Sequence, residues 1–535
     1  MVNWLRSKIR GPLIQMLKNK VSQLKCVALL SVFWAGSIAY AQNNYVAFEL
    51  QRENNWDSLI TEDVNGDGAN DLVFSSYTEG IGRELHIHHQ QADGTFASSP
   101  KRIEIKTEII AVGFADLRPA PGKELLLLSS NGIFSLSTAI QGYTGNIRQL
   151  LEWDLIAAIP DLQQLQFFNG VADLNGDGNV DLLLPGDEQY GYFAGLGDER
   201  FELVSLFTTV NENLRAAQRG SQESELTAQL SINPDKGVVI QLSASAPSPF
   251  RNFIEAWDES STEQSSLLRS EHWMPTAVLA ELNQDELLDI VYLNVADDGL
   301  GQLNIHYQSI ESGFASTPDW TGSLETSGDL QLVDMDNDGL LDLLRLSGDI
   351  NEWDARFYVN RDGEFDLHQP AQVMRFSGYD LRLDFINAES TNEPVLNVSY
   401  YTIPVVDAIR NASINRIQLL YGSDQAETGQ LFNRRPDARL EESFSAANVR
   451  GLSEQMSLHY DVDGDGNRDA LYITDNGTLA AKKIDAELRI ADEPFWEYVS
   501  PRTVFEFEVI ELNNDGNPDL LLRHGTTTTV LVAAP

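Results

Sequence analysis

The chain has 535 residues, and its 37 Lys and Arg against 80 Asp and Glu give a formal net charge of −43 at pH 7. Such a length allows several domains, so internal repeats must be sought before the chain is divided. The strong negative charge argues against nucleic acid or an anionic membrane surface as a partner. It suits cation binding and solubility in an extracellular medium, although a generally acidic surface accounts for most of it.

The first 41 residues have the features of a secretory signal peptide. They contain six Lys or Arg and no Asp or Glu, and an apolar run over 26–39 leads into the small-x-small pattern at 39–41. Cleavage before Gln42 is therefore expected, with an uncleaved anchor or a start at Met16 as the alternatives. The run is shorter than a membrane-spanning helix. The only cysteine, Cys26, lies in this segment, so the exported protein is expected to have neither disulfides nor a cysteine metal site.

From residue 45 onward, short apolar runs alternate with clusters of Gly, Asn, Asp and Ser, a pattern typical of β-strands and turns. An acidic nonapeptide separates two such runs in six places. Each copy has an oxygen-bearing side chain at positions 1, 3, 5 and 9 and is followed by an apolar run. Two of the copies begin with Glu instead of Asp. The six copies begin at residues 63, 173, 281, 334, 461 and 511.

The spacing of the copies predicts further, degenerate units. Neighbouring copies lie 50 to 53 residues apart, whereas the gaps from 63 to 173 and from 173 to 281 are about twice as long. We expect a degenerate unit at 116–124, a second at 229–242 and a third near 384–387, the last with an insertion near 400–440. The chain then contains up to nine units.

A second marker repeats in phase with the acidic loops. In Gly94-Thr-Phe96, Ser312-Gly-Phe314 and Gly363-Glu-Phe365, the phenylalanine lies 31–33 residues after the start of its loop. A unit of about 53 residues with four short strands has the size of a β-propeller blade. The last unit lacks an outer strand, so the run at 45–50 is expected to complete it and close the ring. The sequence therefore predicts an all-β fold, a single β-propeller of seven to nine four-stranded blades.

The copy at 461–469 reads Asp-Val-Asp-Gly-Asp-Gly-Asn-Arg-Asp. Four carboxylates in so short a loop repel one another unless a cation lies among them. Calcium is a hard ion that accepts six to eight oxygen ligands in a flexible shell, so it is the expected occupant and a substitute for disulfides. The expected ligands are the side chains of Asp461, Asp463 and Asp465 and the backbone carbonyl of Asn467, with Asp469 closing the loop.

The acidic nonapeptide, the apolar strand after it and the Gly-x-Phe turn together resemble the FG-GAP/VCBS repeat of integrin-α-like propellers over about 45–535. The resemblance implies that 42–535 form one propeller domain closed by its N-terminal strand, with calcium at all six loops. Around 116, 229 and 384 the sequence departs from the pattern and lacks ligands. By position, the implied ligands are Asp63, Asn65, Asp67, Ala69, Asp71, Asp173, Asn175, Asp177, Asn179, Asp181, Glu281, Asn283, Asp285, Asp289, Asp334, Asp336, Asp338, Leu340, Asp342, Asp461, Asp463, Asp465, Asn467, Asp469, Glu511, Asn513, Asp515, Asn517 and Asp519.

Three other interpretations fit less well. An EF-hand needs a Glu at position 12 of its loop, and the residues there are Phe74, Leu184, Arg345, Tyr472 and Leu522. The Trp-Asp pairs of a WD-repeat propeller fall at inconsistent offsets from the acidic loops. Two separate propellers need a linker, and no Pro/Ser-rich break divides the sequence.

The sequence gives little support for catalysis. It contains no nucleophile elbow, phosphate loop or zincin helix. His86 and His88 would share one face of a strand, with His89 beside them, and an exposed strand face is favoured there over a metal or substrate site. Trp273, Trp320 and Trp496 could stack on sugars, but packing within the fold is the default interpretation.

These features favour a non-enzymatic, calcium-stabilised propeller that binds a glycan or an extracellular protein. It is expected to be secreted, periplasmic or attached to the cell surface, without nucleic acid and without membrane insertion after signal cleavage. FG-GAP/VCBS repeats also occur in lyases, so an exported polysaccharide-degrading lyase or hydrolase is the second hypothesis. A structural role in assembly at the cell surface is the third.

Overall fold

The computed structural model describes residues 45–51, 59–153, 163, 165–168, 170–186, 189–208, 240–242, 277–295, 300–325, 328–387, 393–403, 413–424, 430–445, 456–474, 476–485, 487–513, 515 and 517–533. The expected signal peptide at 1–41 lies outside these residues. No helix among the described residues is both long and apolar enough to cross a membrane.

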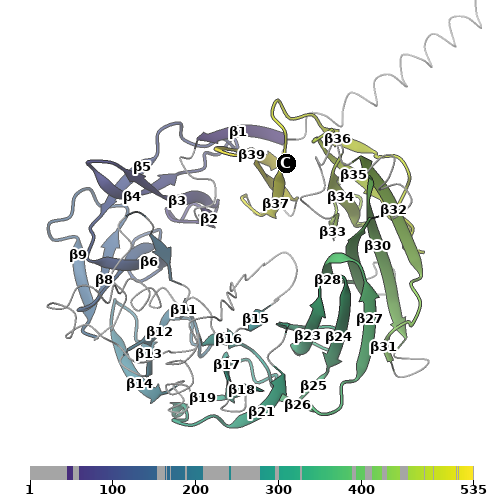
Figure 1. Cartoon of the computed structure of the whole chain (residues 1–535). Helices are drawn as coiled ribbons and strands as arrows, with labels where there is room; N and C mark the ends of the chain where they lie inside the picture. Colours follow the sequence, from purple (N-terminus) through teal and green to yellow (C-terminus); the bar gives the residue numbers. More distant parts are fainter. Residues whose placement is uncertain are drawn as a thin grey trace, which may run out of the picture.

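Eight antiparallel sheets form a closed ring, so the chain is a single eight-bladed β-propeller (Figure 1). The first four blades, in chain order, are built from two-to-eight-residue strands. The first blade contains β2 (Leu59–Glu62), β3 (Asp71–Thr78), β4 (Gly82–His88) and β5 (Lys101–Ile105), and the second contains β6 (Ile109–Ala115), β7 (Glu124–Ser129), β8 (Gly132–Ser137), β9 (Ile147–Leu151) and, parallel to β6, β10 (Gln166–Phe167). The third blade contains β11 (Val171–Ala172), β12 (Asp181–Pro185), β13 (Tyr190–Gly195) and β14 (Phe201–Phe207). The fourth contains β16 (Val278–Ala280), β17 (Asp289–Val295), β18 (Leu300–His306) and β21 (Trp320–Glu325).

The other four blades include the longest strands in the described part of the chain. The fifth blade contains β15 (Ile240–Leu242), β22 (Asp329–Val333), β23 (Asp342–Asp349), β24 (Glu352–Tyr358) and β27 (Gln372–Ser377), and the sixth contains β28 (Tyr379–Asn387), β29 (Pro394–Thr402), β30 (Ser413–Asp424) and β32 (Ala438–Ser445), with β31 (Gln430–Phe432) at the end of β30. The seventh blade contains β33 (Ser457–Tyr460), β34 (Asp469–Ile473), β35 (Leu479–Lys483) and β36 (Trp496–Tyr498). The eighth contains β37 (Glu506–Ile510), β38 (Asp519–Arg523), β39 (Thr527–Ala533) and β1 (Tyr45–Gln51). Two short hairpins, β19 (Gln308–Ser309) with β20 (Gly313–Phe314) and β25 (Asn360–Arg361) with β26 (Glu364–Phe365), follow the third strands of the fourth and fifth blades.

The apolar run after each acidic loop forms the second strand of a blade. In β12 and β34 every residue is buried, because each blade packs between two neighbours and both faces of this strand are covered. The hydrophobic core therefore lies between blades. Val73 and Leu85 of the first blade, for example, pack against Val112 and Leu125 of the second.

The two ends of the described chain meet in one blade. β1 pairs antiparallel with β39 along seven residues, from Tyr45 with Ala533 to Gln51 with Thr527. Figure 1 shows the first and last colours of the chain side by side in this sheet. The pairing is the one that the missing outer strand of the last unit predicts, and it leaves the ring without a break.

The eight blades fall within the expected range of seven to nine, and the described end of the expected unit at 229–242 does not start a blade of its own. Residues 229–239 lie outside the described part of the chain, and β15 joins the fifth blade by pairing antiparallel with β22. A strand that is donated to a neighbouring blade has an apolar run but no partner strands of its own, so spacing alone could not distinguish it from a unit. The degenerate units at 116–124 and 384–387 do form blades, the second and the sixth.

The phenylalanines of the Gly-x-Phe turns pack between blades. Phe96, Phe314 and Phe365 are almost fully buried. Each ring contacts an aromatic ring of an adjacent blade, with Phe365 lying 5.9 Å from Trp320. Trp496 likewise packs on Tyr45, 5.8 Å away, so Trp320 and Trp496 take the structural role, whereas Trp273 lies outside the described residues.

The histidines of β4 do share one face, but the expectation that this face is exposed is wrong. His86 and His88 both contact the ring of Phe74, and His88 also lies 5.6 Å from Phe48 of the eighth blade. A third strand faces the neighbouring blade in a closed ring, which covers it. His88 Nδ1 is 2.8 Å from the Ala97 carbonyl oxygen.

Burial lowers the pKa of His88 and of His306, which holds the equivalent place in the fourth blade. A buried neutral histidine adds stability above its unfolded pKa of about 6.5, and this stability is lost as the pH falls, because only the unfolded state takes up the proton. We expect the free energy of unfolding of wild type to fall, relative to that of H88Q/H306Q, as the pH is lowered from 8 to 5. Each histidine contributes at most about 1.4 kcal/mol to this fall for each pH unit. Urea unfolding at both pH values measures it, and a difference independent of pH contradicts it.

Candidate metal centre

All six acidic nonapeptides connect the first strand of a blade to the second. They join β2 to β3, β11 to β12, β16 to β17, β22 to β23, β33 to β34 and β37 to β38. The degenerate copy at 116–124 joins β6 to β7 in the same way. Because the blades are equivalent, these loops all lie at the same end of the ring.

The first residue of each complete loop organises the turn. Asp461 accepts hydrogen bonds from the backbone N–H groups of Gly464 (2.8 Å) and Gly466 (2.6 Å). Both glycines have positive φ, 73° and 87°, a conformation that costs other residues free energy. Asp63 and Asp334 accept the corresponding N–H bonds in their own loops. The loop is thus wrapped by its own carboxylate.

Positions 3 and 5 are oriented by similar local bonds. Asn65 Oδ1 accepts a hydrogen bond from the N–H of Asp67 (2.8 Å), and Asp67 Oδ1 accepts one from the N–H of Ala69 (3.0 Å). Asp465 accepts the equivalent bond from Asn467. Such bonds fix the rotamers of short side chains, so the free lone pairs of these oxygens have defined directions.

The loop at 334–342 brings three carboxylates together. Asp334, Asp336 and Asp338 each have one oxygen within 4.8 Å of the other two. Oxygens bound to one calcium ion at about 2.3–2.6 Å lie at most about 5 Å apart. The group therefore has the chemistry and the size of a calcium shell, and burial together with the charge of Asp338 raises the pKa of Asp334.

Position 9 is a buried anchor. All six aspartates at this position, Asp71, Asp181, Asp289, Asp342, Asp469 and Asp519, have an exposed fraction of 0%. Asp342 accepts the N–H of Met335 with one oxygen (3.0 Å) and that of Asn360 with the other (2.7 Å). Burial raises the pKa of Asp342 to about 8 and that of Asp289 to about 7. The residue thus ties its loop to the end of the third strand.

The loops that have Asn at position 3 are less strongly acidic. In three of them the Asn amide donates to the carboxylate at position 5, as Asn65 does to Asp67 Oδ2 (3.0 Å). Groups of three close acidic side chains occur, within the described residues, at 334–342 and at 461–469, where they comprise Asp461, Asp463 and Asp469.

Lys483 enters the second of these groups. Its Nζ donates to Asp463 and Asp465, both at 2.7 Å. The hydrogen bond from Lys483 holds the pKa of Asp465 at about 2, well below its usual range. Sequence reasoning missed this residue because it lies 20 positions beyond Asp463 and comes from β35.

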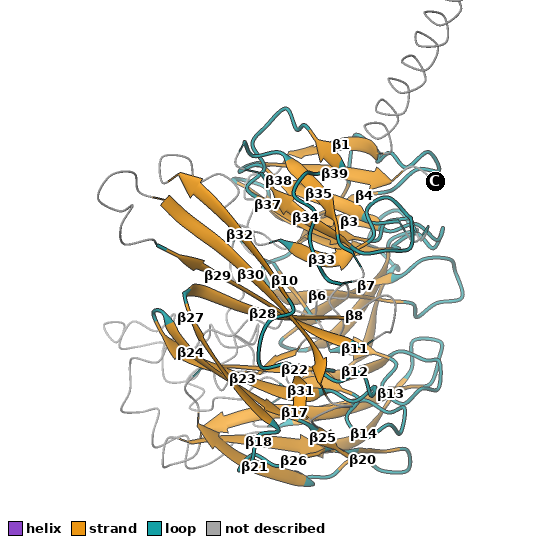
Figure 2. Ribbon diagram, turned by 90° about the vertical axis from the view of Figure 1, so that its right-hand side faces the viewer, coloured by secondary structure: helices purple, strands orange, loops and turns teal. Residues whose placement is uncertain are grey.

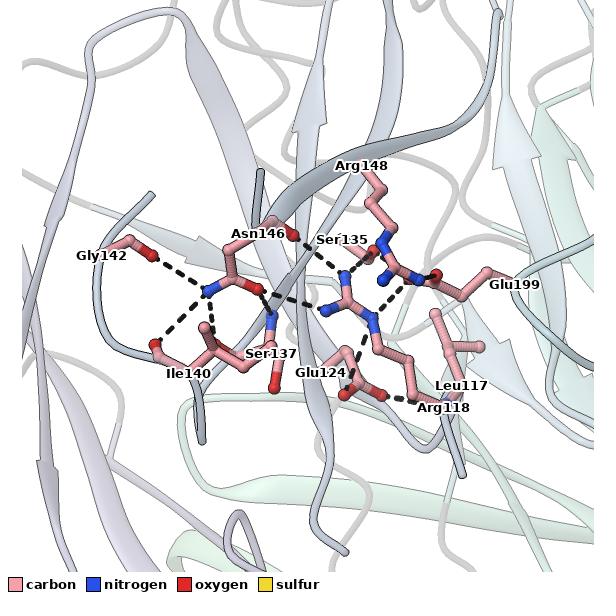
Figure 3. A network of polar contacts seen from close by, with 10 residues as sticks. All are labelled: Leu117, Arg118, Glu124, Ser135, Ser137, Ile140, Gly142, Asn146, Arg148 and Glu199. Atoms are coloured by element: carbon pink, nitrogen blue, oxygen red, sulfur yellow. Dashed lines mark hydrogen bonds and ion pairs between the residues drawn. The ribbon is translucent and has the colours of Figure 1, made fainter. Parts of the chain in front are cut away.

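In the degenerate loop at 116–124 an arginine replaces the ligand at position 3 (Figure 3). Arg118 is buried, and its Nε donates to Glu199 Oε1 (2.7 Å), while Nη2 donates to Ser135 Oγ (2.9 Å) and Nη1 to Asn146 Oδ1 (3.2 Å). Glu124, at position 9, accepts the N–H of Leu117 at position 2 (3.1 Å), as the aspartates do elsewhere, and also that of Arg118 (3.1 Å). The guanidinium thus supplies the positive charge in this loop.

Glu199 comes from the next blade, in the turn between β13 and β14. It also accepts hydrogen bonds from Ser135 and from Arg148 (Figure 3), and these contacts with Ser135, Arg118 and Arg148 lower its pKa despite its burial. The network joins the second and third blades. An Arg at a ligand position was a visible signal in the sequence, whereas no pattern pointed to Glu199.

A groove lies beside the sixth blade, whose long strands β29, β30 and β32 project from the ring (Figure 2). Its volume is about 320 Å³. Its walls come from β30, β32, the residue preceding β32 and the turn that follows β35. They combine polar and apolar side chains: Gln418, Leu420, Asp437, Ala438, Arg439, Leu440, Leu488, Arg489 and Ile490.

No protein-family model matches the chain, and no curated protein matches it significantly. Among solved structures, it is similar to an Agrocybe aegerita lectin that recognises non-reducing terminal N-acetylglucosamine (TM-score 0.34, 12% identity, 74% of this chain and 81% of the lectin). It is also similar to an exotype rhamnogalacturonan lyase (TM-score 0.33, 12% identity, 91% and 76%) and to a periplasmic gluconolactonase from Pseudomonas aeruginosa (TM-score 0.30, 11% identity, 87% and 99%). Similarities at this level do not select a function.

Proposed function

We propose that this protein is an exported calcium-binding propeller of the FG-GAP/VCBS type that acts as a non-enzymatic binding module for a glycan or an extracellular protein. The observation that carries the calcium part is the group of Asp334, Asp336 and Asp338. Three carboxylate oxygens this close repel one another, and a divalent cation among them turns that repulsion into attraction.

The residues present fit calcium at this loop. Asp334, Asp336 and Asp338 would hold the ion with side-chain oxygens, and Leu340 would add its backbone carbonyl. Calcium, when bound, supplies a positive charge that attracts oxygens from along the whole loop and so stabilises its folded form. The chain itself keeps these oxygens in place through the N–H groups of Asn337, Gly339 and Leu340, which donate to Asp334 and Asp338. Calcium would therefore meet a largely preformed site.

The groove beside the sixth blade is the proposed ligand site. Asp437, Arg439 and Arg489 offer donors and acceptors that suit sugar hydroxyls, and the leucines and Ile490 offer apolar surface for a ring face. A volume of about 320 Å³ is small for a ligand site, so it suits one terminal sugar or one short segment of a longer ligand.

Screening of residues 42–535 on a glycan array, with calcium and with chelator, tests the proposal. Calcium-dependent binding to a defined set of saccharides supports it. Cleavage of a polysaccharide, lost on a point substitution that leaves the melting temperature unchanged, would establish the enzymatic alternative. A stable protein partner, with no glycan bound, would identify the ligand as a protein.

Substitution of two arginines that line the groove tests whether the groove binds the ligand. The double variant R439A/R489A should lose affinity for the ligand found on the array by at least about tenfold, since each lost charged hydrogen bond is worth about 1.5–3 kcal/mol. Both side chains are more than half exposed, so the melting temperature should not change. R375A, an exposed arginine of β27, is the matched control for charge. Equal affinity of wild type and R439A/R489A would place the ligand elsewhere.

A further inference from the structure

Lys483 lies inside the acidic loop whose sequence matches the calcium pattern best. The residue ends β35, and the hairpin register places it opposite Asp469 of β34. Its Nζ is 2.7 Å from Asp463 Oδ1, 2.7 Å from Asp465 Oδ2 and 3.2 Å from Asp469 Oδ1. One ammonium group therefore contacts positions 3, 5 and 9 of the loop at once.

Two of these contacts are hydrogen bonds, to Asp463 and Asp465, and the third is an ion pair with Asp469. Lysine has three donors, and hydrogen bonds of about 2.7–2.9 Å between charged partners are the strong ones. The Nζ also lies 4.5 Å from the centre of the Phe495 ring, a cation–π contact. The side chain is only 33% exposed. Lys483 is thus held in the loop by the acids and by the Phe495 ring.

This arrangement belongs to one blade and not to the repeat. Continuing each hairpin register by one residue gives the residues opposite position 9 in the other five acidic loops. They are His89, Ala194, Tyr307, Val359 and Val532. None of the five has a permanent positive charge, and of these only His89 could acquire one.

The degenerate loop at 116–124 shows that the fold accepts a tethered cation in this place. There Arg118 stands at position 3, and its guanidinium is paired with Glu199 of the next blade. Two of the loop sites in the ring therefore contain a cationic side chain of the chain itself. Arg118 belongs to the loop itself, whereas Lys483 comes from the facing strand, β35.

We propose that the ammonium group of Lys483 is the resident cation of the 461–469 loop and takes the place of calcium there. A divalent ion needs the oxygens of Asp463 and Asp465 that Lys483 already occupies, and two cations a few ångströms apart repel each other. Because Lys483 is part of the same chain, it competes at a high effective concentration. Calcium binding by the other loops rests on the proposed function, whereas the role of Lys483 does not.

Calcium stoichiometry of the full mature chain, measured by equilibrium dialysis, tests this inference with K483M. The substitution removes the charge and keeps the length of the side chain. We expect K483M to bind one more calcium ion per chain than wild type does. In excess chelator K483M should melt below wild type, because its three acids lose their partner, and calcium should reverse that loss.

Two further variants make each result decisive. D463N/D465N in the wild-type background should leave the calcium stoichiometry unchanged, and in the K483M background it should abolish the additional site. K482M removes the neighbouring lysine of β35, which pairs with Glu442 outside the acidic loops, and it should have no effect on stoichiometry. A wild type that loses one calcium on D463N/D465N, or a K483M that gains none, overturns the inference. If wild type binds no calcium at all, the proposed function fails, and the gain by K483M is still measurable.

Discussion

Excess chelator is expected to lower the melting temperature of the mature protein by a large margin, and added calcium is expected to restore it. A ligand that binds only the folded state stabilises it by RT ln(1 + [L]/Kd), about 2.7 kcal/mol per site at a hundredfold excess over Kd. Five loops without a resident lysine would together contribute on the order of 10 kcal/mol. That is comparable to the whole free energy of unfolding of a typical domain.

The loop at 334–342 supplies a matched control for this experiment. D336N/D338N removes two of the three close carboxylates, so it should reduce the calcium-dependent rise in melting temperature. In excess chelator the same variant should be at least as stable as wild type, since it also removes like-charge repulsion. Magnesium should restore less stability than calcium, because it demands a small octahedral shell. An unchanged melting curve of wild type in excess chelator would show that the loops are ordinary turns.

The fold could be predicted from the sequence because six blades contain the acidic loop and three of these also contain the Gly-x-Phe turn in phase with it. The acidic loop fixes the start of the second strand and the Gly-x-Phe turn fixes the end of the third, so the four-strand unit follows. The exact blade number, within the expected seven to nine, could not be predicted in the same way. β15 has the composition of a unit strand, and only its pairing with β22 shows that it belongs to the fifth blade.

The acidic loops of the candidate site could be predicted from the sequence, but the charged side chains that reach them from elsewhere in the chain could not. Nine consecutive residues carry the loop, and local hydrogen bonds such as those to Asp461 are encoded in the same stretch. Lys483 and Glu199 reach their loops from other strands or other blades. Their contacts depend on register and on packing between blades, which a one-dimensional pattern does not record.

Replacing a ninth-position aspartate should destabilise the protein strongly even with calcium present. D342A leaves the N–H groups of Met335 and Asn360 without acceptors in the buried interior. Each unsatisfied buried donor costs about 1–3 kcal/mol, so the expected total is about 2–6 kcal/mol. The midpoint of urea unfolding in saturating calcium measures this loss.

The comparison of three variants separates the anchoring role from the loss of an acid. D342N keeps one acceptor oxygen, so its cost should lie between those of wild type and D342A. D349A removes an exposed aspartate from the far end of the same strand, β23, and should stay within about 0.5 kcal/mol of wild type. Equal midpoints for D342A and D349A would mean that the acidic loop and the third strand are not coupled through position 9. The order wild type, D342N, D342A would instead show that the fifth blade is held by a buried carboxylate in addition to any ion.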